Sequence, residues 1–345
     1  MTIIHTLVCT TVLISTLASA GTLNPAMYPV MDKLPPANAS WSAAILKNIP
    51  NLPVNQKGLP NPDWSKDVTN CPKANQWGLS YDDGPGPYTA DLLSALKARN
   101  QLATFFIIGS RAIEYPAQLL QTYQAGHQIG IHTWSHPQAT TVSSEQYVAE
   151  IVFTAQAIKE IIGVTPRFFR PPYGDIDDRI RAILQNLGLT IVEWSLDSKD
   201  ADGALDVVQQ FQKAANAGSG PVISLEHDLF ATSEPQAAPA LDAILAGSGK
   251  YVPMPIDKCL GYAAYDEGFW DRVAGKGLPP VNPLPVSTAS AAATSHSTSQ
   301  ALPTGLVNKN PASSSTGSVA KSGSIASQIS FGVSAIAIAV GLVFV

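Results

Sequence analysis

Short apolar strands alternate with helical stretches throughout residues 66–265, and this alternation restricts the fold more than any other feature of the chain. Apolar runs predict strands at 77–81, 103–108, 128–132, 167–170, 190–196 and 221–226. Helical spacing predicts helices at 89–99, 116–126, 143–163 and 177–188. Strands and helices that alternate in this way form a parallel sheet with the helices outside it. The sequence therefore predicts an α/β fold, either a barrel or a doubly wound sheet.

Polar residues follow five of these predicted strands, each at the point where the strand ends. The five groups are Asp82-Asp83, His132 with His136, Arg170 with Tyr173, Asp197 with Asp200, and His227-Asp228. The carboxyl ends of parallel strands lie at the same edge of a sheet, and active sites are built at that edge. Each group alone has an ordinary explanation, such as a solvated turn or a rigid loop. Their occurrence in order at strand ends favours a functional site.

Two adjacent carboxylates, Asp82 and Asp83, stand on a stiff Gly-Pro-Gly-Pro turn. Neighbouring anions repel each other, and burying both is costly unless a cation shares the site. One carboxylate with His132 and His136 forms a suitable ligand set for a divalent metal that keeps a position open for water. Because successive side chains at a strand end point in different directions, one aspartate is expected to bind the metal and the other to lie beside the water. We expect Zn²⁺.

Both ends of the chain have the composition of targeting signals. Residues 1–20 are apolar and end in Ala-Ser-Ala, which predicts a cleaved signal peptide rather than a membrane anchor. Residues 329–345 form an apolar tail behind a Pro-, Ser- and Thr-rich stretch at 279–328, which predicts a disordered stalk and a GPI-anchor signal. The alternative for the tail is a short membrane helix. We expect a secreted protein held on the extracellular face of the cell membrane and in the cell wall, with an irregular N-terminal extension at 21–65.

Two cysteines remain once the predicted signal peptide is removed. Cys71 and Cys259 flank the segment that holds the motifs, and an even cysteine count in an oxidising compartment predicts a disulfide between them. Two free buried thiols are the alternative. Asn38-Ala39-Ser40 is a sequon, which predicts glycosylation at Asn38.

Five ordered motifs, YDDGP, HTWSH, RPPYGD, DSKD and LEHD, together resemble the polysaccharide deacetylase family, also called carbohydrate esterase family 4. The match covers about residues 75–230, and the predicted GPI signal makes the chain most similar to the fungal chitin deacetylases. The resemblance implies an irregular (β/α)7 barrel over residues 66–265. It also implies that Asp83, His132 and His136 bind the metal, either Zn²⁺ or another divalent ion such as Co²⁺.

The resemblance also implies roles for the other motif residues. In the family pattern Asp82 is the general base, and Arg170 pairs with it. His227 is the general acid, and Asp200 orients it. Two further positions contact substrate, namely the backbone N–H of Tyr173 and the side chain of Leu225. The fourth motif normally ends in Asp-Trp, but Ala201 follows Asp200 here, so an aromatic wall of the substrate groove is missing at that position.

The implied activity is hydrolysis of the N-acetyl amide of chitin, which yields chitosan and acetate. Two alternatives remain open: a deacetylase or esterase of another acetylated polysaccharide such as xylan, and a non-catalytic chitin-binding protein of the cell wall. Nothing in the composition suggests a nucleic-acid partner, because charged residues make up 14% of the chain, the net charge is −5 and no basic cluster occurs. A two-metal nuclease or phosphatase would need further carboxylates. We expect a monomer.

Overall fold

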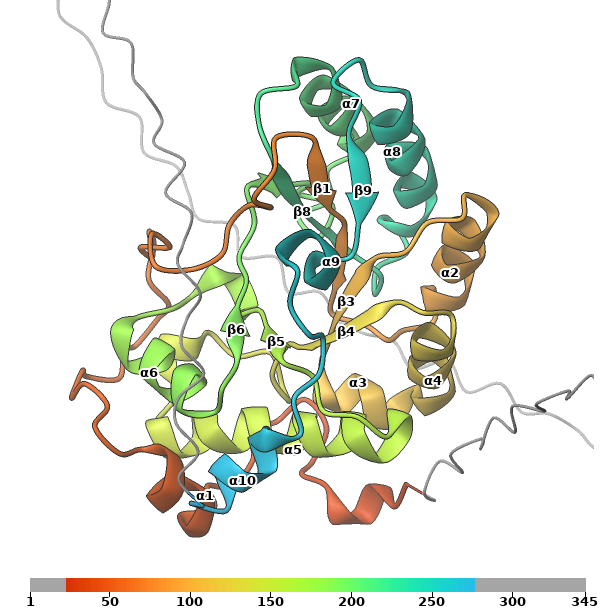
Figure 1. The fold of residues 1–345 in the computed structure, drawn as a ribbon. Coiled ribbons are helices and arrows are strands. Elements are labelled where there is room, and N and C mark those ends of the chain that lie inside the picture. The colour runs from red at the N-terminus through yellow and green to blue at the C-terminus, as the bar shows by residue number, and fades with distance from the viewer. Residues whose placement is uncertain (1–22, 277–345) are drawn as a thin grey trace, which may run out of the picture. The chain divides into compact units, whose positions relative to one another are not determined.

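The computed structural model describes residues 23–276, drawn in colour in Figure 1. The predicted signal peptide at 1–20, the stalk at 279–328 and the apolar tail at 329–345 lie outside the described residues. Among the helices of residues 23–276, none combines the length and the apolar character that crossing a membrane requires.

A parallel β-sheet forms the centre of the fold, with the strand order β6-β5-β4-β3-β2-β8-β1-β9 and with β7 paired to β8. Every pairing between these strands is parallel, as the sequence predicted. The strands are β1 (Gln76–Gly78), β2 (Ser80–Asp82), β3 (Thr104–Ile107), β4 (Gln128–Ile131), β5 (Phe168–Phe169), β6 (Thr190–Ile191), β7 (Leu196–Asp197), β8 (Val222–His227) and β9 (Val252–Met254). Strand β8 pairs with three strands, since β1 and β2 pair with successive parts of it and β7 pairs with it as well.

Helices surround the sheet (Figure 1). They are α1 (Ala39–Ile45), α2 (Thr89–Ala98), α3 (Gly109–Glu114), α4 (Pro116–Gln124), α5 (Ser144–Ile162), α6 (Asp178–Asn186), α7 (Val207–Ala217), α8 (Glu234–Ala246), α9 (Ile256–Leu260) and α10 (Gly268–Val273). Three 3-10 turns accompany them: η1 (Pro25–Met27), η2 (Ala139–Thr141) and η3 (Pro172–Gly174). The α/β class predicted from the alternation of strands and helices is therefore confirmed.

Local sequence explains the ends of the longest helix, α5. The side chain of Ser143 caps the helix by accepting a hydrogen bond from the Gln146 N–H, which is one of the two cap positions that the sequence offered. Gly163 ends α5 with a φ of 84°, a left-handed conformation that glycine adopts without a steric penalty. Twelve of the nineteen residues of α5 are buried, so this helix contributes one large apolar face to the core.

Two predicted strands are divided in the structure: 77–81 into β1 and β2, and 190–196 into β6 and β7. The second division has the larger effect on the path of the chain. Thr190 and Ile191 pair with β5, but the next two residues pair with Val68 of the N-terminal segment. The chain then turns to β8, with which Leu196 pairs. The prediction of one continuous strand is wrong because the backbone changes its pairing partner twice within seven residues.

The N-terminal segment packs against the rest of the fold. Its helix α1 contacts α5 through the rings of Trp41 and Phe153, whose centroids lie 5.0 Å apart. Asn38 caps α1, and its side-chain oxygen accepts hydrogen bonds from the backbone N–H groups of Ser40 and Trp41. The cap uses Oδ1 and leaves free Nδ2, the atom to which an N-linked glycan attaches, so glycosylation of Asn38 stays a prediction.

Cys71 and Cys259 form a disulfide between the residues that precede β1 and helix α9. The two cysteines are 188 positions apart in the sequence, so the bond closes a very long loop. Both are almost completely buried. In the chain-entropy description, a crosslink over a loop of this length removes many conformations from the unfolded state.

We predict that replacing both cysteines (Cys71→Ser with Cys259→Ser) lowers the free energy of unfolding by up to about 5 kcal/mol, because the unfolded chain regains its loop entropy. Chemical denaturation followed by tryptophan fluorescence measures the change. Wild-type protein unfolded in a reducing agent is the control and should lose a similar amount. An unchanged unfolding midpoint in the double variant would contradict the prediction.

Candidate active site

Side chains from the carboxyl ends of the strands line one cleft of about 770 Å³. The predicted site residues that line it are Asp82, Asp83, His132, His136, Tyr173, Leu225 and His227. Arg170 and Asp200 are buried and contact this set through hydrogen bonds. The structure therefore brings together the residues that the sequence analysis selected from five separate motifs.

Three predicted ligands converge in this cleft. Asp83 follows β2, and His132 and His136 follow β4. Nε2 of His132 lies 3.4 Å from Asp83 Oδ1, and Nε2 of His136 lies 3.2 Å from the same oxygen. One possible ligand atom of each residue lies within 4.8 Å of those of the others, which is close enough for a single metal ion to contact all three.

The hydrogen bonds of these side chains fit a cation. Nδ1 of His132 lies 2.8 Å from the carbonyl oxygen of Arg170, which only accepts, so Nδ1 carries a proton. In the neutral imidazole, the form that binds a metal, Nε2 then presents its lone pair to Asp83. Asp83 Oδ1 is buried and receives no hydrogen bond from any residue of 23–276. These two acceptor atoms, His132 Nε2 and Asp83 Oδ1, would repel each other in the buried site unless a cation lay between them. A second-sphere carbonyl that fixes the tautomer of a ligating histidine is also typical of metal sites.

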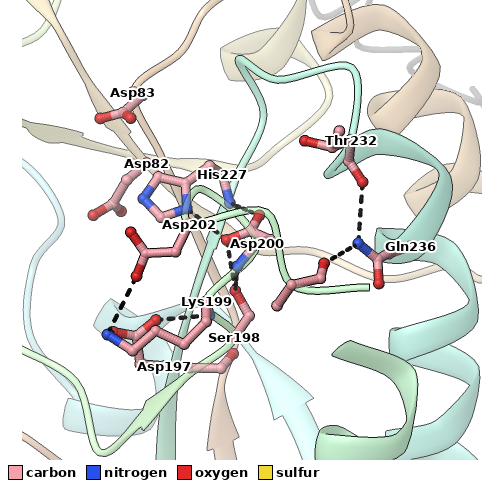
Figure 2. Close-up of polar contacts among 12 residues, drawn as sticks. Asp82, Asp83, Asp197, Ser198, Lys199, Asp200, Asp202, His227, Thr232 and Gln236 are labelled. Carbon is pink, nitrogen blue, oxygen red and sulfur yellow. Dashed lines mark hydrogen bonds and ion pairs between the residues drawn. The ribbon is translucent and has the colours of Figure 1, made fainter. Parts of the chain in front are cut away.

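The backbone around these ligands adopts left-handed conformations that are uncommon for residues with a side chain. Asp83, Thr133, His136 and Tyr173 have φ values of 75°, 68°, 58° and 61°. Such conformations persist where surrounding structure fixes them, and they occur often at functional sites. At Asp83 the change of backbone conformation directly after β2 sends its carboxylate in a different direction from that of Asp82 (Figure 2).

A buried glutamate on α5 holds the loop between the two histidines. Glu150 Oε2 accepts hydrogen bonds from the backbone N–H groups of Trp134 at 2.7 Å and Ser135 at 2.8 Å. Its Oε1 accepts one from the Ser135 hydroxyl at 2.6 Å. Burial raises the pKa of Glu150 to about 7, although these hydrogen bonds act in the opposite direction. The motifs in the sequence do not include Glu150. Its position on the apolar face of the predicted helix, where an acidic residue is unusual, is the one feature that could have indicated its role.

Asp82 is held by Arg170, whose side chain is completely buried. The guanidinium donates to Asp82 Oδ1 at 2.8 Å and to the backbone carbonyl oxygens of Val192 and Glu193 at 3.3 and 3.2 Å. It also lies over the ring of Phe106, 4.4 Å from the centroid. The other oxygen of Asp82 is 3.8 Å from Nε2 of His132, so this carboxylate borders the candidate metal position without being one of its three converging ligands.

His227 lies at the end of β8, directly beside Asp82 in the register of β2 and β8 (Figure 2). Its Nδ1 is 2.7 Å from Asp200 Oδ1, and its backbone N–H donates to Asp200 Oδ2 at 2.9 Å. Burial alone would lower the pKa of His227, but the Asp200 hydrogen bond and the charges of Asp83, Asp200 and Asp82 outweigh it and raise the pKa to about 9. The contact with Asp200 therefore favours the protonated imidazole.

The remaining predicted contacts line the cleft around these groups. The ring of Tyr173 lies against that of His136, with centroids 4.7 Å apart, and its backbone N–H makes no hydrogen bond to the described residues. Leu225 is buried in the cleft wall, and Ala201 lines the rim without an aromatic ring. His127 lies outside this cleft, where its Nδ1 accepts a hydrogen bond from the Ala103 N–H.

The chain is similar to known proteins over this region. The family model for polysaccharide deacetylase matches residues 69–192. Chitin deacetylase 1 of Cryptococcus neoformans var. grubii is 38% identical over 282 residues, which are 69% of this chain and 60% of the relative. The chitin deacetylase of Amylomyces rouxii is 45% identical over 138 residues, or 40% of this chain and 33% of that protein.

A solved structure is similar as well. The chitin deacetylase from the fungal pathogen Colletotrichum lindemuthianum is 28% identical, and the likeness covers 58% of this chain and 95% of that one with a TM-score of 0.53. Of the two curated relatives, the chain spans 60% of the Cryptococcus neoformans protein and 33% of the Amylomyces rouxii protein. The family match, the identities and the shared parallel fold agree that the chain contains a polysaccharide deacetylase domain, which includes residues 69–192.

Proposed function

We propose that this protein is a metal-dependent chitin deacetylase, which hydrolyses the N-acetyl amide of N-acetylglucosamine units and releases acetate. One observation carries the proposal: a candidate metal position, an Arg170-held carboxylate and an Asp200-held imidazolium lie together in one cleft. Relatives named chitin deacetylase support chitin as the substrate. An esterase of acetylated xylan would use the same groups, so the substrate has to be tested directly.

Asp83, His132 and His136 are the residues that would hold the metal, and we propose Zn²⁺ because one carboxylate and two imidazoles suit this ion. When bound, such an ion supplies Lewis-acid chemistry, which makes water more acidic and polarises a carbonyl group. Glu150 and the Arg170 carbonyl fix the two histidines before any ion arrives. A site built in this way needs little rearrangement on binding.

The chain's own residues move the protons. Asp82, which Arg170 orients, accepts a proton from the attacking water as its oxygen bonds to the acetyl carbon. The backbone N–H of Tyr173 is available to donate to the oxygen on which negative charge develops. His227 donates its proton to the amide nitrogen as the carbon–nitrogen bond breaks, so that a neutral amine leaves. Asp200 keeps the imidazole oriented and protonated for this step.

We predict that the protein releases acetate from chitin oligomers and loses this activity in a chelator, since the charge held by Asp83 and the two histidines is then removed. Adding Zn²⁺ back should restore the rate. Acetylated xylan measured in parallel decides the substrate class. Acetate release from xylan alone, or full activity without metal, would contradict the proposal.

We predict that Asp82→Asn lowers kcat by about 10²–10⁴-fold, because the amide cannot accept the water's proton. Bound metal should remain stoichiometric, since Asp82 lies outside the ligand set. Metal analysis and steady-state kinetics of the same preparation test both statements. Asp91→Asn, at an exposed aspartate in the first turn of α2, is the control and should behave as wild type. A variant with the wild-type kcat would place the base elsewhere.

We predict that Asp200→Asn moves the alkaline limit of kcat to lower pH by about 1–3 units, because the lost anion no longer favours the protonated imidazole. The acid form of His227 exists below its pKa and is lost as the pH rises through that value. The charge of Asp83 contributes to the raised pKa of His227, and a bound cation would cancel part of that contribution. The test therefore compares the alkaline limits of the variant and the wild type, both with metal bound. Profiles of kcat against pH that superimpose would exclude His227 as the acid.

A further inference from the structure

The cleft extends well beyond the groups that act on the acetyl amide. Its lining also includes Asp32 and Arg111, and a group made of Asp197, Lys199 and Asp202 (Figure 2 shows this group). Pockets of about 300–1,000 Å³ bury an entire drug-sized ligand. The cleft of about 770 Å³ is therefore much larger than one acetamide group and has room for neighbouring sugar units.

Asp32 belongs to the N-terminal segment, which lies before the region that the family model matches. Residues 28–32 are attached to the loop that carries the two histidines. The ring of Tyr28 stacks on Trp134, with centroids 5.7 Å apart and planes 4° from parallel, and the indole N–H of Trp134 donates to the Val30 carbonyl oxygen at 3.2 Å. Trp134 lies between His132 and His136 in the sequence, so this segment is held against the reacting end of the cleft.

The carboxylate of Asp32 is oriented by two partners. Oδ1 accepts a hydrogen bond from the hydroxyl of the buried Ser110 at 3.0 Å, and Oδ2 pairs with the Arg111 guanidinium. Glu114 also pairs with Arg111. The φ of Asp32 is 56°, a conformation that a residue with a side chain keeps only where its surroundings fix it. The Asp32 side chain is nevertheless 59% exposed, so part of this fixed carboxylate remains open to the cleft.

We propose that Asp32 and Arg111 form a sugar-binding subsite, in which they bind the hydroxyl groups of a unit next to the one that reacts. The inference rests on the proposed function, since it takes the polymer as the ligand. A carboxylate accepts hydrogen bonds from hydroxyl groups and a guanidinium donates to their oxygens, so the pair can satisfy both roles of a sugar hydroxyl. A pair fixed before binding loses little freedom when the sugar arrives. The other explanation is a surface ion pair without a role in binding.

Kinetics on two substrates separate these explanations. The variants are Asp32→Ala and Asp32→Asn in the full chain, and the substrates are a chitin tetramer and a small activated acetyl ester. For the tetramer we expect KM to rise about tenfold in Asp32→Ala, the effect of losing a hydrogen bond to a charged group, with kcat within about twofold of wild type. The small ester does not reach the subsite, so its kinetics should be unchanged. Asp32→Asn keeps an acceptor for Ser110 and should lose less.

Lys33→Ala is the matched control, because this exposed neighbour does not line the cleft. Unchanged KM for the tetramer in both Asp32 variants would overturn the subsite. An equal loss on tetramer and ester would also overturn it, because the substitution would then act on the reacting centre through the Trp134 loop. Wild-type protein that cleaves the ester but not the tetramer would instead refute the proposed function. If Asp32→Ala does not fold, Asp32→Asn and Arg111→Lys decide the question by the same criteria.

Discussion

The possible ligand atoms of Asp83, His132 and His136 lie within 4.8 Å of one another in the cleft, and the rest of the site is arranged around this convergence. The proton on Nδ1 of His132 is fixed by the Arg170 carbonyl, so in the neutral imidazole Nε2 and the buried Oδ1 of Asp83 meet as two acceptors. An uncompensated arrangement of this kind is expensive in a low-dielectric place. A divalent cation would remove the cost, which is why we propose a metal centre beside Asp83.

The fold supplies the surroundings that this centre requires. Parallel pairing places the end of β2 beside the end of β8, so Asp82 and His227 are neighbours although they are far apart in the sequence. Charged groups behind the cleft keep these side chains in position: Arg170 holds Asp82, Asp200 holds His227, and Glu150 holds the histidine loop. The N-terminal segment then adds a wall to the cleft through its contact with Trp134.

Local patterns in the sequence predicted the positions of every strand except β9, and they predicted the four helices α2, α4, α5 and α6. They also predicted the grouping of the motif residues, because strand ends of a parallel sheet share an edge. They did not predict Glu150, whose partners lie 15 and 16 positions away on a separate loop. The division into β6 and β7 also depends on a distant partner, Val68. Asp32 lines the cleft because its segment contacts α3 and Trp134, and these contacts are long-range as well. What sequence patterns miss here is contact between residues that are remote along the chain.

X-ray absorption at the zinc edge of the zinc-loaded protein identifies the atoms that surround the metal. We expect one Zn²⁺ per chain with nitrogen and oxygen neighbours at about 2.0–2.2 Å and two imidazoles among its ligands. Replacing His132 with alanine should remove one imidazole signature and weaken binding, whereas replacing His127, a histidine outside the cleft, should leave the spectrum unchanged. A spectrum of hydrated zinc without imidazole neighbours, or one that His132→Ala does not alter, would contradict the account.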